Sequence, residues 1–202
     1  IHPWPEFGDM EIEEHLAQLR KMKLTQMVEQ AIWMASIDAK GRQEKRNIYD
    51  NQILLRNNAL LMRINPATVE LLDPFAKAGF TKTKVKVGVE LEEEIEMMNR
   101  AALTHNMTIR MDFNSRLSWN TFEKYVNGLT PLAKKQIEYF EDPFPYDASM
   151  WKEARKLMAL AIDWEIKKIP LDQDAPVEAD FIVLKPTHED VNARVEQCIK
   201  WE

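Results

Sequence analysis

Short apolar runs alternate with segments of helical periodicity over most of the chain. From residue 58 onward these runs recur roughly every 22–30 residues, and each is followed by apolar residues at helical spacing. The pattern predicts strands over residues 58–62, 82–87, 107–112, 136–140, 159–163 and 181–184. It predicts helices over residues 66–76, 90–103, 118–128 and 147–157, and another from about residue 189. Strands and helices that alternate in this way form right-handed βαβ units around a parallel sheet.

The part of the chain before residue 58 has a different pattern. Asp9 is a suitable N-cap for a helix through residue 22, because apolar residues follow it at helical spacing. A second helix is expected over residues 25–45, and residues 53–55 have the pattern of extended chain. This part is therefore expected to be mainly helical.

The two faces of the predicted strands differ in polarity. In residues 107–112, three apolar side chains share one face, whereas the opposite face ends in Arg110 and Asp112. An open doubly wound sheet would bury both faces in long apolar runs beneath helices. A barrel has one apolar face beneath its helices and one face toward its axis, with polar chemistry at the carboxyl ends of the strands. We therefore predict an α/β fold, a (β/α)8-type (TIM-like) barrel of which this sequence supplies strands one to six.

The strand at residues 82–87 carries three lysines on one face. Lys82, Lys84 and Lys86 alternate with β-branched residues, so their ammonium groups point the same way. A solvated edge strand with protective lysines would give the same pattern. Alternatively, an ammonium group crowded by other cations has a lowered pKa, which makes the amine a usable base near neutral pH.

Charged residues also end the successive strands on the face that would line the barrel axis. These residues are Lys84, Lys86, Asp112, Glu141, Asp163 and Lys185. Three carboxylates without a histidine or cysteine suit a hard divalent cation, Mg²⁺ before Zn²⁺. Simpler explanations exist for single residues, such as a turn at Asp112, a helix start at Glu141 and a strand end at Lys185. Their joint occurrence at successive strand ends favours a metal site.

Composition limits the classes of partner. The 202 residues carry a net charge of −6 and no basic run, which argues against nucleic acid. The apolar runs are too short to span a membrane, and the single cysteine, Cys198, fits a reducing cytosol. Five glycines are too few for phosphate-cradling loops. These features favour a cytoplasmic protein and argue against nucleic acid and membranes as its partners.

Five motifs follow one another at the strand ends. They are Lys84-Val85-Lys86, Arg110-Met111-Asp112-Phe113-Asn114, Tyr139-Phe140-Glu141-Asp142-Pro143, Ala161-Ile162-Asp163 and Val183-Leu184-Lys185-Pro186-Thr187. In this order they resemble the motif set of the enolase superfamily, within its muconate-lactonising subgroup. The opening His2-Pro3-Trp4-Pro5 and the last motif are most similar to the o-succinylbenzoate synthase family, of menaquinone biosynthesis. The resemblance implies that residues 1–57 are the helical part of a capping domain and that residues 58–202 are part of the barrel with the active site.

The resemblance also implies a role for each strand-end residue. The implied cofactor is Mg²⁺, with Mn²⁺ as a substitute, held by Asp112, Glu141 and Asp163. Lys86 would remove the proton α to the carboxylate of a small-molecule substrate, and Lys84 and the cation would keep it neutral. Lys185 would stabilise the resulting negative charge from the opposite side. Elimination of water would follow, which implies a carbon–oxygen lyase (a dehydratase).

Arg110 and Asn114 are candidates for substrate binding or for pKa tuning. Arg110 shares the axial face with Asp112 one layer deeper, and its positive charge is expected to lower the pKa of Lys86.

The chain departs from the family pattern at Asp142, where Glu or Gln is commoner, so that either Glu141 or Asp142 could be the metal ligand. Strand parity with Ile137 and Tyr139 favours Glu141.

Two other functions stay open on the sequence. The same lysine pair would serve a dipeptide epimerase or an N-acylamino-acid racemase, if Lys185 returned a proton to the other face. A function of another class is a barrel that binds a metal and an acid ligand without turnover. The last two barrel strands and the sheet of the capping domain are missing, so we expect these residues to be a portion of a polypeptide of roughly 300 residues or more.

Overall fold

The computed structural model describes residues 11–21, 26–48, 50, 56–186 and 189–201. It divides the chain into two compact units, Ile1–Leu54 with Leu184–Ile199, and Leu55–Val183 with Lys200–Glu202. The expected N-cap at Asp9 and the extended run at 53–55 lie outside the described residues. The boundary between Leu54 and Leu55 lies near the domain boundary that was expected at residue 57, but residues 184–199 group with the amino-terminal unit. The division into a capping domain and a barrel domain stays a prediction.

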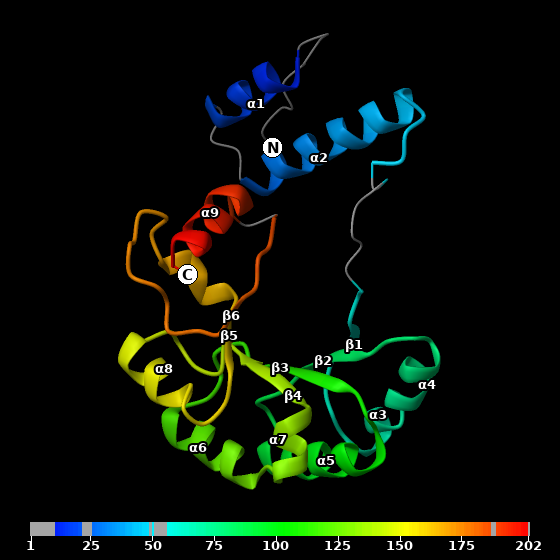
Figure 1. The fold of residues 1–202 in the computed structure, drawn as a ribbon, viewed down its shortest axis with the longest axis vertical. Coiled ribbons are helices and arrows are strands. Elements are labelled where there is room, and N and C mark those ends of the chain that lie inside the picture. Colours follow the sequence, from blue (N-terminus) through cyan, green and yellow to red (C-terminus); the bar gives the residue numbers. More distant parts are fainter. Residues whose placement is uncertain (1–10, 22–25, 49, 51–55, 187–188, 202) are drawn as a thin grey trace, which may run out of the picture. The chain divides into compact units, whose positions relative to one another are not determined.

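A six-stranded sheet forms the second unit together with its helices (Figure 1). The strands are β1 (Ala59–Leu61), β2 (Lys82–Lys86), β3 (Thr108–Asp112), β4 (Ile137–Glu141), β5 (Leu160–Ile162) and β6 (Phe181–Ile182). All neighbouring strands are parallel, and their order in the sheet follows the sequence. A doubly wound sheet reverses its strand order at a switch point, so this order confirms barrel-type winding. Within the described residues, β1 and β6 each pair with one neighbour.

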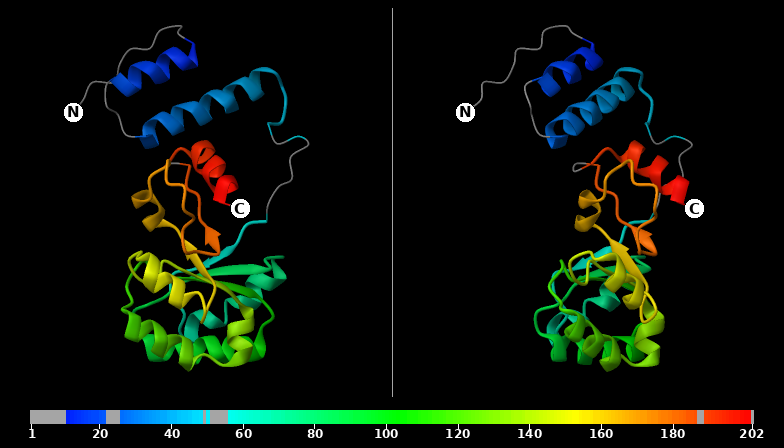
Figure 2. Two further views of the ribbon diagram at one scale, coloured as in Figure 1. Left: turned by 60° about the vertical axis from the view of Figure 1, so that its left-hand side comes forward. Right: turned by 90° about the vertical axis from the view of Figure 1, so that its left-hand side faces the viewer.

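Helices cover one face of this sheet (Figure 1), and the green helices α5 to α7 keep to that face in the other views (Figure 2). The helices are α3 (Pro66–Val69), α4 (Leu72–Lys77), α5 (Leu91–Thr104), α6 (Trp119–Gly128), α7 (Pro131–Gln136) and α8 (Ala148–Ala154). Four of these helices, α3, α6, α7 and α8, follow an N-cap residue whose side chain accepts a hydrogen bond from a backbone N–H group of the helix. These residues are Asn65, Ser118, Thr130 and Asp147. The polar side chains of the strands therefore lie on the opposite face of the sheet, which is the face that lines the axis of a barrel.

The apolar pattern does not predict every helical segment. It misses α7, which ends where β4 begins, and the 3-10 helix η1 (Trp164–Lys168), which follows β5. The single helix expected over residues 66–76 is divided into α3 and α4. These segments have four to six residues each, which is too short for helical periodicity to be visible.

The apolar face of the sheet packs against the helices. Val85, Met111 and Phe140 are completely buried there. The ring of Phe140 lies 4.8 Å from that of Phe113 and 5.9 Å from that of Tyr125, measured between centroids. Aromatic pairs at these distances stabilise a core beyond the area that they bury. The lysines of β2 alternate with buried residues and are half-buried on the other face, which confirms the predicted parity of this strand.

A register shift interrupts the pairing of β3 with β4. Ile109 pairs with Ile137, but Arg110 pairs with Tyr139, so that Glu138 is an extra residue in β4. Ile137 packs in the apolar core, whereas the ring of Tyr139 lies beneath the Arg110 guanidinium on the axial face. The prediction that Ile137 and Tyr139 share a face is therefore wrong, because the bulge changes the alternation between them.

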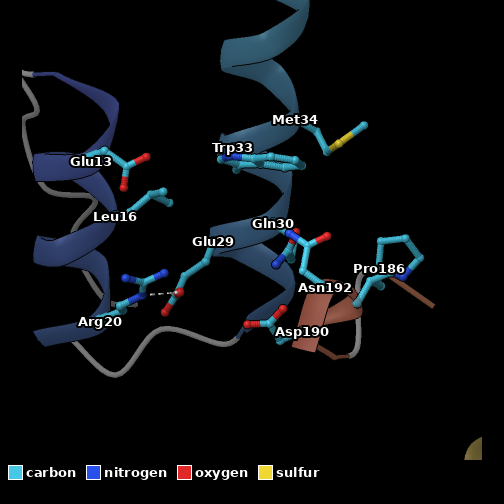
Figure 3. A pocket seen from close by; sticks show the side chains of 11 residues that line it. Glu13, Leu16, Arg20, Glu29, Gln30, Trp33, Met34, Pro186, Asp190 and Asn192 are labelled. Atoms are coloured by element: carbon cyan, nitrogen blue, oxygen red, sulfur yellow. Dashed lines mark hydrogen bonds and ion pairs between the residues drawn. The ribbon is translucent and has the colours of Figure 1, made fainter. Parts of the chain in front are cut away.

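The amino-terminal unit contains α1 (Ile12–Lys21), α2 (Gln26–Gln43) and most of α9 (Val191–Trp201). The three helices were predicted from the sequence. A pocket of about 340 Å³ is lined by residues of α1, α2 and the start of α9, and Arg20 pairs there with Glu29 at 3.1 Å (Figure 3). Trp33 and Met34 border this pocket, and the candidate residues of the sequence analysis do not line it. None of the helices in the described part of the chain has both the length and the apolar character that a membrane span requires.

Candidate active site

The carboxyl ends of β2, β3 and β4 bring four of the predicted residues together. Lys86, Asp112 and Glu141 pair side by side in the sheet register. The Nζ atom of Lys84 lies 2.5 Å from Oε1 of Glu141 and 3.0 Å from Oδ2 of Asp112. The Nζ atom of Lys86 lies 3.2 Å from the same Asp112 oxygen. The parallel register thus converts charges that are 26 to 57 residues apart in sequence into one cluster.

Glu141 is the most buried member of this cluster, with 1% of its surface exposed. Burial raises the pKa of Glu141 to about 7, and the negative charges of Asp112 and Asp163 add to this rise against the opposing effect of Lys84. Its Oε2 atom is buried and has no hydrogen-bond partner among the described residues. The Glu141 carboxylate therefore has unused capacity to bind a cation or a proton.

The lysines of β2 are not crowded by unpaired cations, contrary to the prediction. Burial lowers the pKa of Lys84, but hydrogen bonds and attraction to Glu141 and Asp112 outweigh this and raise it. Lys86 has Asp112 as its partner, and Lys82 pairs with Glu138. The prediction considered only the charges of one strand, whereas the neighbouring strands supply a carboxylate for each ammonium group.

Arg110 lies in a second charged cluster, one layer deeper on the axial face. Its Nε atom is 2.5 Å from Oε2 of Glu138, which Lys82 also contacts. Burial raises the pKa of Glu138, but the hydrogen bonds from Arg110 and Lys82 outweigh burial and lower it. The Arg110 guanidinium also lies 5.1 Å from the ring centroid of Tyr139. Glu138 thus balances the charge of Arg110, and the effect of Arg110 on Lys86 stays a prediction.

Asn114 donates hydrogen bonds to the other carboxylate oxygen of Asp112. Its backbone N–H and its Nδ2 group donate to Asp112 Oδ1 at 3.2 and 2.9 Å. Asn114 adopts a left-handed φ of 49°, a conformation that asparagine tolerates well. The structure therefore gives Asn114 a direct part in orienting Asp112, whose Oδ2 faces the two lysines.

Asp142 and Glu141 have different partners. The Asp142 carboxylate accepts the backbone N–H groups of Asp163 and Trp164 at 3.0 and 2.8 Å. Burial raises the pKa of Asp142, although these two N–H donors oppose the rise. Because both Asp142 oxygens are engaged, Glu141 is the better candidate ligand. Sequence reasoning missed this role of Asp142, since its partners come from a loop about twenty residues later.

The remaining two candidates follow β5 and β6. Asp163 comes directly after β5, is 8% exposed and acts electrostatically on Glu141. Lys185 comes after β6, is half-buried and groups with the amino-terminal unit. Its position on the opposite side of a substrate stays a prediction.

The chemistry of the carboxylates fits a hard divalent cation. Asp112, Glu141 and Asp163 supply oxygen donors of the type that Mg²⁺ prefers, and Glu141 has a buried oxygen without a partner in the described part of the structure. The described side chains nevertheless do not bring three or more His, Cys, Asp or Glu residues into position around one ion. Instead, the Lys84 ammonium group lies between Asp112 and Glu141. The residues fit the cation, and their assignment as its ligands is a proposal.

Two protein-family models match the chain. The model described as o-succinylbenzoate synthase, N-terminal domain, matches residues 1–41, and the model described as enolase C-terminal domain-like matches residues 67–167. The second match covers half of the 202 residues and includes β2 to β5.

A curated relative from Bdellovibrio bacteriovorus, an o-succinylbenzoate synthase, is 41% identical over 201 residues. The alignment covers 100% of this chain and 61% of that protein. The chain thus spans less than two thirds of the length of this relative.

Solved structures have the same fold. An o-succinylbenzoate synthase from Thermosynechococcus elongatus BP-1, complexed with Mg in its active site, aligns with a TM-score of 0.56 at 21% identity, over 72% of this chain and 49% of that chain. A mandelate racemase/muconate lactonizing family protein from Azoarcus sp. EbN1 aligns with a TM-score of 0.67 at 16% identity, over 94% of this chain and 54% of that chain. The sequential parallel sheet and the family model that matches half of the residues lead to one conclusion: the chain belongs to the enolase superfamily.

Proposed function

We propose that this chain carries part of the active site of an o-succinylbenzoate synthase, a Mg²⁺-dependent lyase of menaquinone biosynthesis in the cytoplasm. The observation that carries the proposal is the cluster of two half-buried lysines, Lys84 and Lys86, with the buried Asp112 and Glu141 at the carboxyl ends of β2 to β4. This is the end of a barrel at which active sites lie. The family-model match at residues 1–41 and the 41% identical relative support this reaction over others of the superfamily.

Lys86 is the proposed base. Its Nζ atom would take the proton α to the substrate carboxylate, which requires the neutral amine. The resulting ammonium group would return that proton to the departing hydroxyl group, so that the substrate loses one molecule of water. Lys185 would stabilise the negative charge that develops on the substrate carboxylate, from the opposite side.

Asp112, Glu141 and Asp163 are the proposed ligands of Mg²⁺, with Mn²⁺ as a substitute. When bound, the cation supplies a Lewis acid for the substrate carboxylate. Lys84 contacts both Asp112 and Glu141 and so keeps these two carboxylates close together. Asn114 orients Asp112 through its second oxygen.

Turnover of the synthase substrate by the intact protein tests this proposal. Lys86→Ala is expected to lower kcat by about 10²–10⁴-fold, whereas Mn²⁺ should still bind, because Asp112, Glu141 and Asp163 all remain. Lys82→Ala is the matched control, since Lys82 lies on the same face of β2 but pairs with Glu138. Substantial turnover by Lys86→Ala would remove Lys86 from the mechanism, and a wild-type protein without turnover would overturn the proposed reaction.

The second candidate function is a dipeptide epimerase or an N-acylamino-acid racemase. Lys185, which follows β6, favours this second function. A proton that Lys185 delivers to the opposite face of the substrate's α-carbon would invert the configuration of that carbon. Proton NMR in D₂O with dipeptides and N-acylated amino acids separates the functions: exchange of the α-proton without loss of water supports this second candidate. Mn²⁺ binding without exchange or elimination would support a barrel without turnover.

A further inference from the structure

Asp142 is a buried acid without a part in the proposed reaction. It lies between Glu141 and Pro143 at the end of β4, and 2% of its surface is exposed. Its φ of 39° is in the left-handed region, which few residues other than glycine adopt. A buried carboxylate in such a turn persists only where the surrounding structure supplies specific partners.

The carboxylate of Asp142 binds the end of the neighbouring strand. Its Oδ1 atom accepts the N–H of Asp163 at 3.0 Å, and its Oδ2 atom accepts the N–H of Trp164 at 2.8 Å. These two residues form the junction between β5 and η1. The first of them is a proposed metal ligand, so this hydrogen bond fixes the Asp163 backbone relative to β4.

The main chain of Asp142 contacts two further segments. Its N–H donates to the carbonyl of Ala161 in β5 at 2.9 Å, and its carbonyl accepts the N–H of Ser115 at 2.7 Å. Ser115 follows Asn114, which donates two hydrogen bonds to the Asp112 carboxylate. Four hydrogen bonds of one residue therefore connect the carboxyl ends of β3, β4 and β5.

We propose that Asp142 is a positioning residue that sets the separation of Asp112, Glu141 and Asp163. The inference rests on the metal site of the proposed function. The turn at Asp142 gives two consecutive carboxylates different partners, because Glu141 contacts Lys84 while Asp142 contacts backbone N–H groups. Glu141 thereby keeps an oxygen for the cation, and the three strand ends keep a fixed spacing.

Three measurements on the intact protein test this role. The variants are Asp142→Ala, which removes both acceptors, and Asp142→Asn, which tolerates the left-handed turn but keeps one acceptor oxygen for two N–H groups. The control is Asp180→Ala, because Asp180 Oδ2 accepts the N–H of Leu160 at 2.9 Å, at the other end of the same strand β5. For each variant we would measure the thermal midpoint, the Mn²⁺ dissociation constant by electron paramagnetic resonance, and metal-free amide exchange.

Removing a residue that orients metal ligands typically weakens affinity about 10–100-fold, and we expect this for Asp142→Ala, with a smaller loss for Asp142→Asn. Exchange at the amides of Asp163 and Trp164 should become faster in both. The Asp180→Ala control should lower the thermal midpoint without changing Mn²⁺ affinity. If Asp142→Ala does not fold, Asp142→Asn decides the question.

Wild-type Mn²⁺ affinity in a folded Asp142 variant would overturn the positioning role and leave the proposed function intact. An equal loss of affinity in Asp180→Ala would also overturn it, since the effect would then be general destabilisation. A wild-type protein that does not bind Mn²⁺ would overturn the proposed metal site and this inference together.

Discussion

The buried charge of Glu141 predicts an unusual pH dependence of stability. The pKa of this carboxyl is raised from the ordinary 4.5 to about 7, chiefly by burial. The folded protein therefore binds the Glu141 proton more tightly than the unfolded chain does. Its contribution to stability is fully present below pH 4.5 and is lost as the pH rises from 4.5 toward 7.

The size of this loss follows from the two pKa values. Each tenfold change in proton affinity corresponds to about 1.4 kcal/mol, so the metal-free protein should lose about 3 kcal/mol of unfolding free energy through Glu141 across this range. Glu141→Gln removes the titrating group while its carbonyl oxygen can still accept from Lys84. The difference in unfolding free energy between the wild type and this variant should therefore change by about 3 kcal/mol between pH 4.5 and 7.5.

Urea unfolding of the intact protein in a chelator, at closely spaced pH values, measures this difference. Glu138→Gln is the matched control, because Glu138 lies on the same strand and Arg110 and Lys82 lower its pKa. Its contribution has the opposite sign: it is present above pH 4.5 and is lost as the pH falls through the lowered value. Parallel pH curves for the wild type and Glu141→Gln would refute the reasoning. Saturating Mg²⁺ should reduce the pH dependence, since binding to the charged form stabilises the folded state.

Three further predictions concern the residues around Glu141. Lys84→Met leaves Glu141 without its ammonium partner and Asp112 with Lys86 alone, and urea unfolding at pH 8 without metal should show a loss of about 3 kcal/mol; this loss should shrink at pH 5, where Glu141 is protonated. Asn114→Ala removes the Nδ2 donor to Asp112 Oδ1 and leaves only the backbone N–H there, so titration should show Mn²⁺ affinity weakened about tenfold, whereas unchanged affinity would contradict the orienting role. Arg110→Met should move the acidic limb of the pH–rate profile upward with little change in KM; a large rise in KM alone would instead place Arg110 at the substrate.

Much of the architecture follows from local patterns in the sequence. The period of two in residues 82–87 and 107–112 separates an apolar face from a charged one, and the structure confirms this separation in β2 and β3. The spacing of strands and helices predicts the parallel sheet, because each βαβ unit is built from consecutive residues. The candidate site at the strand ends was visible for the same reason, since a parallel sheet gathers the carboxyl ends of all its strands at one edge.

Other features depend on contacts between strands that no local pattern contains. The extra residue Glu138 in β4 changes which side chains share a face, and it brings a carboxylate to Arg110 and Lys82. Short segments such as α7 and η1 lack the length that periodicity needs.

The sequence by itself determined which residue types stand at the ends of the strands, and hence the family and the class of chemistry to expect. The tertiary structure decided how those charges pair. Lys84 lies between Asp112 and Glu141, and Asp142 connects three strand ends, because the register of neighbouring strands sets these distances. Electrostatic energy depends on the distance between charges and on their burial. Both are properties of the folded chain, so residues with the same charge in the sequence have different chemical roles in the structure.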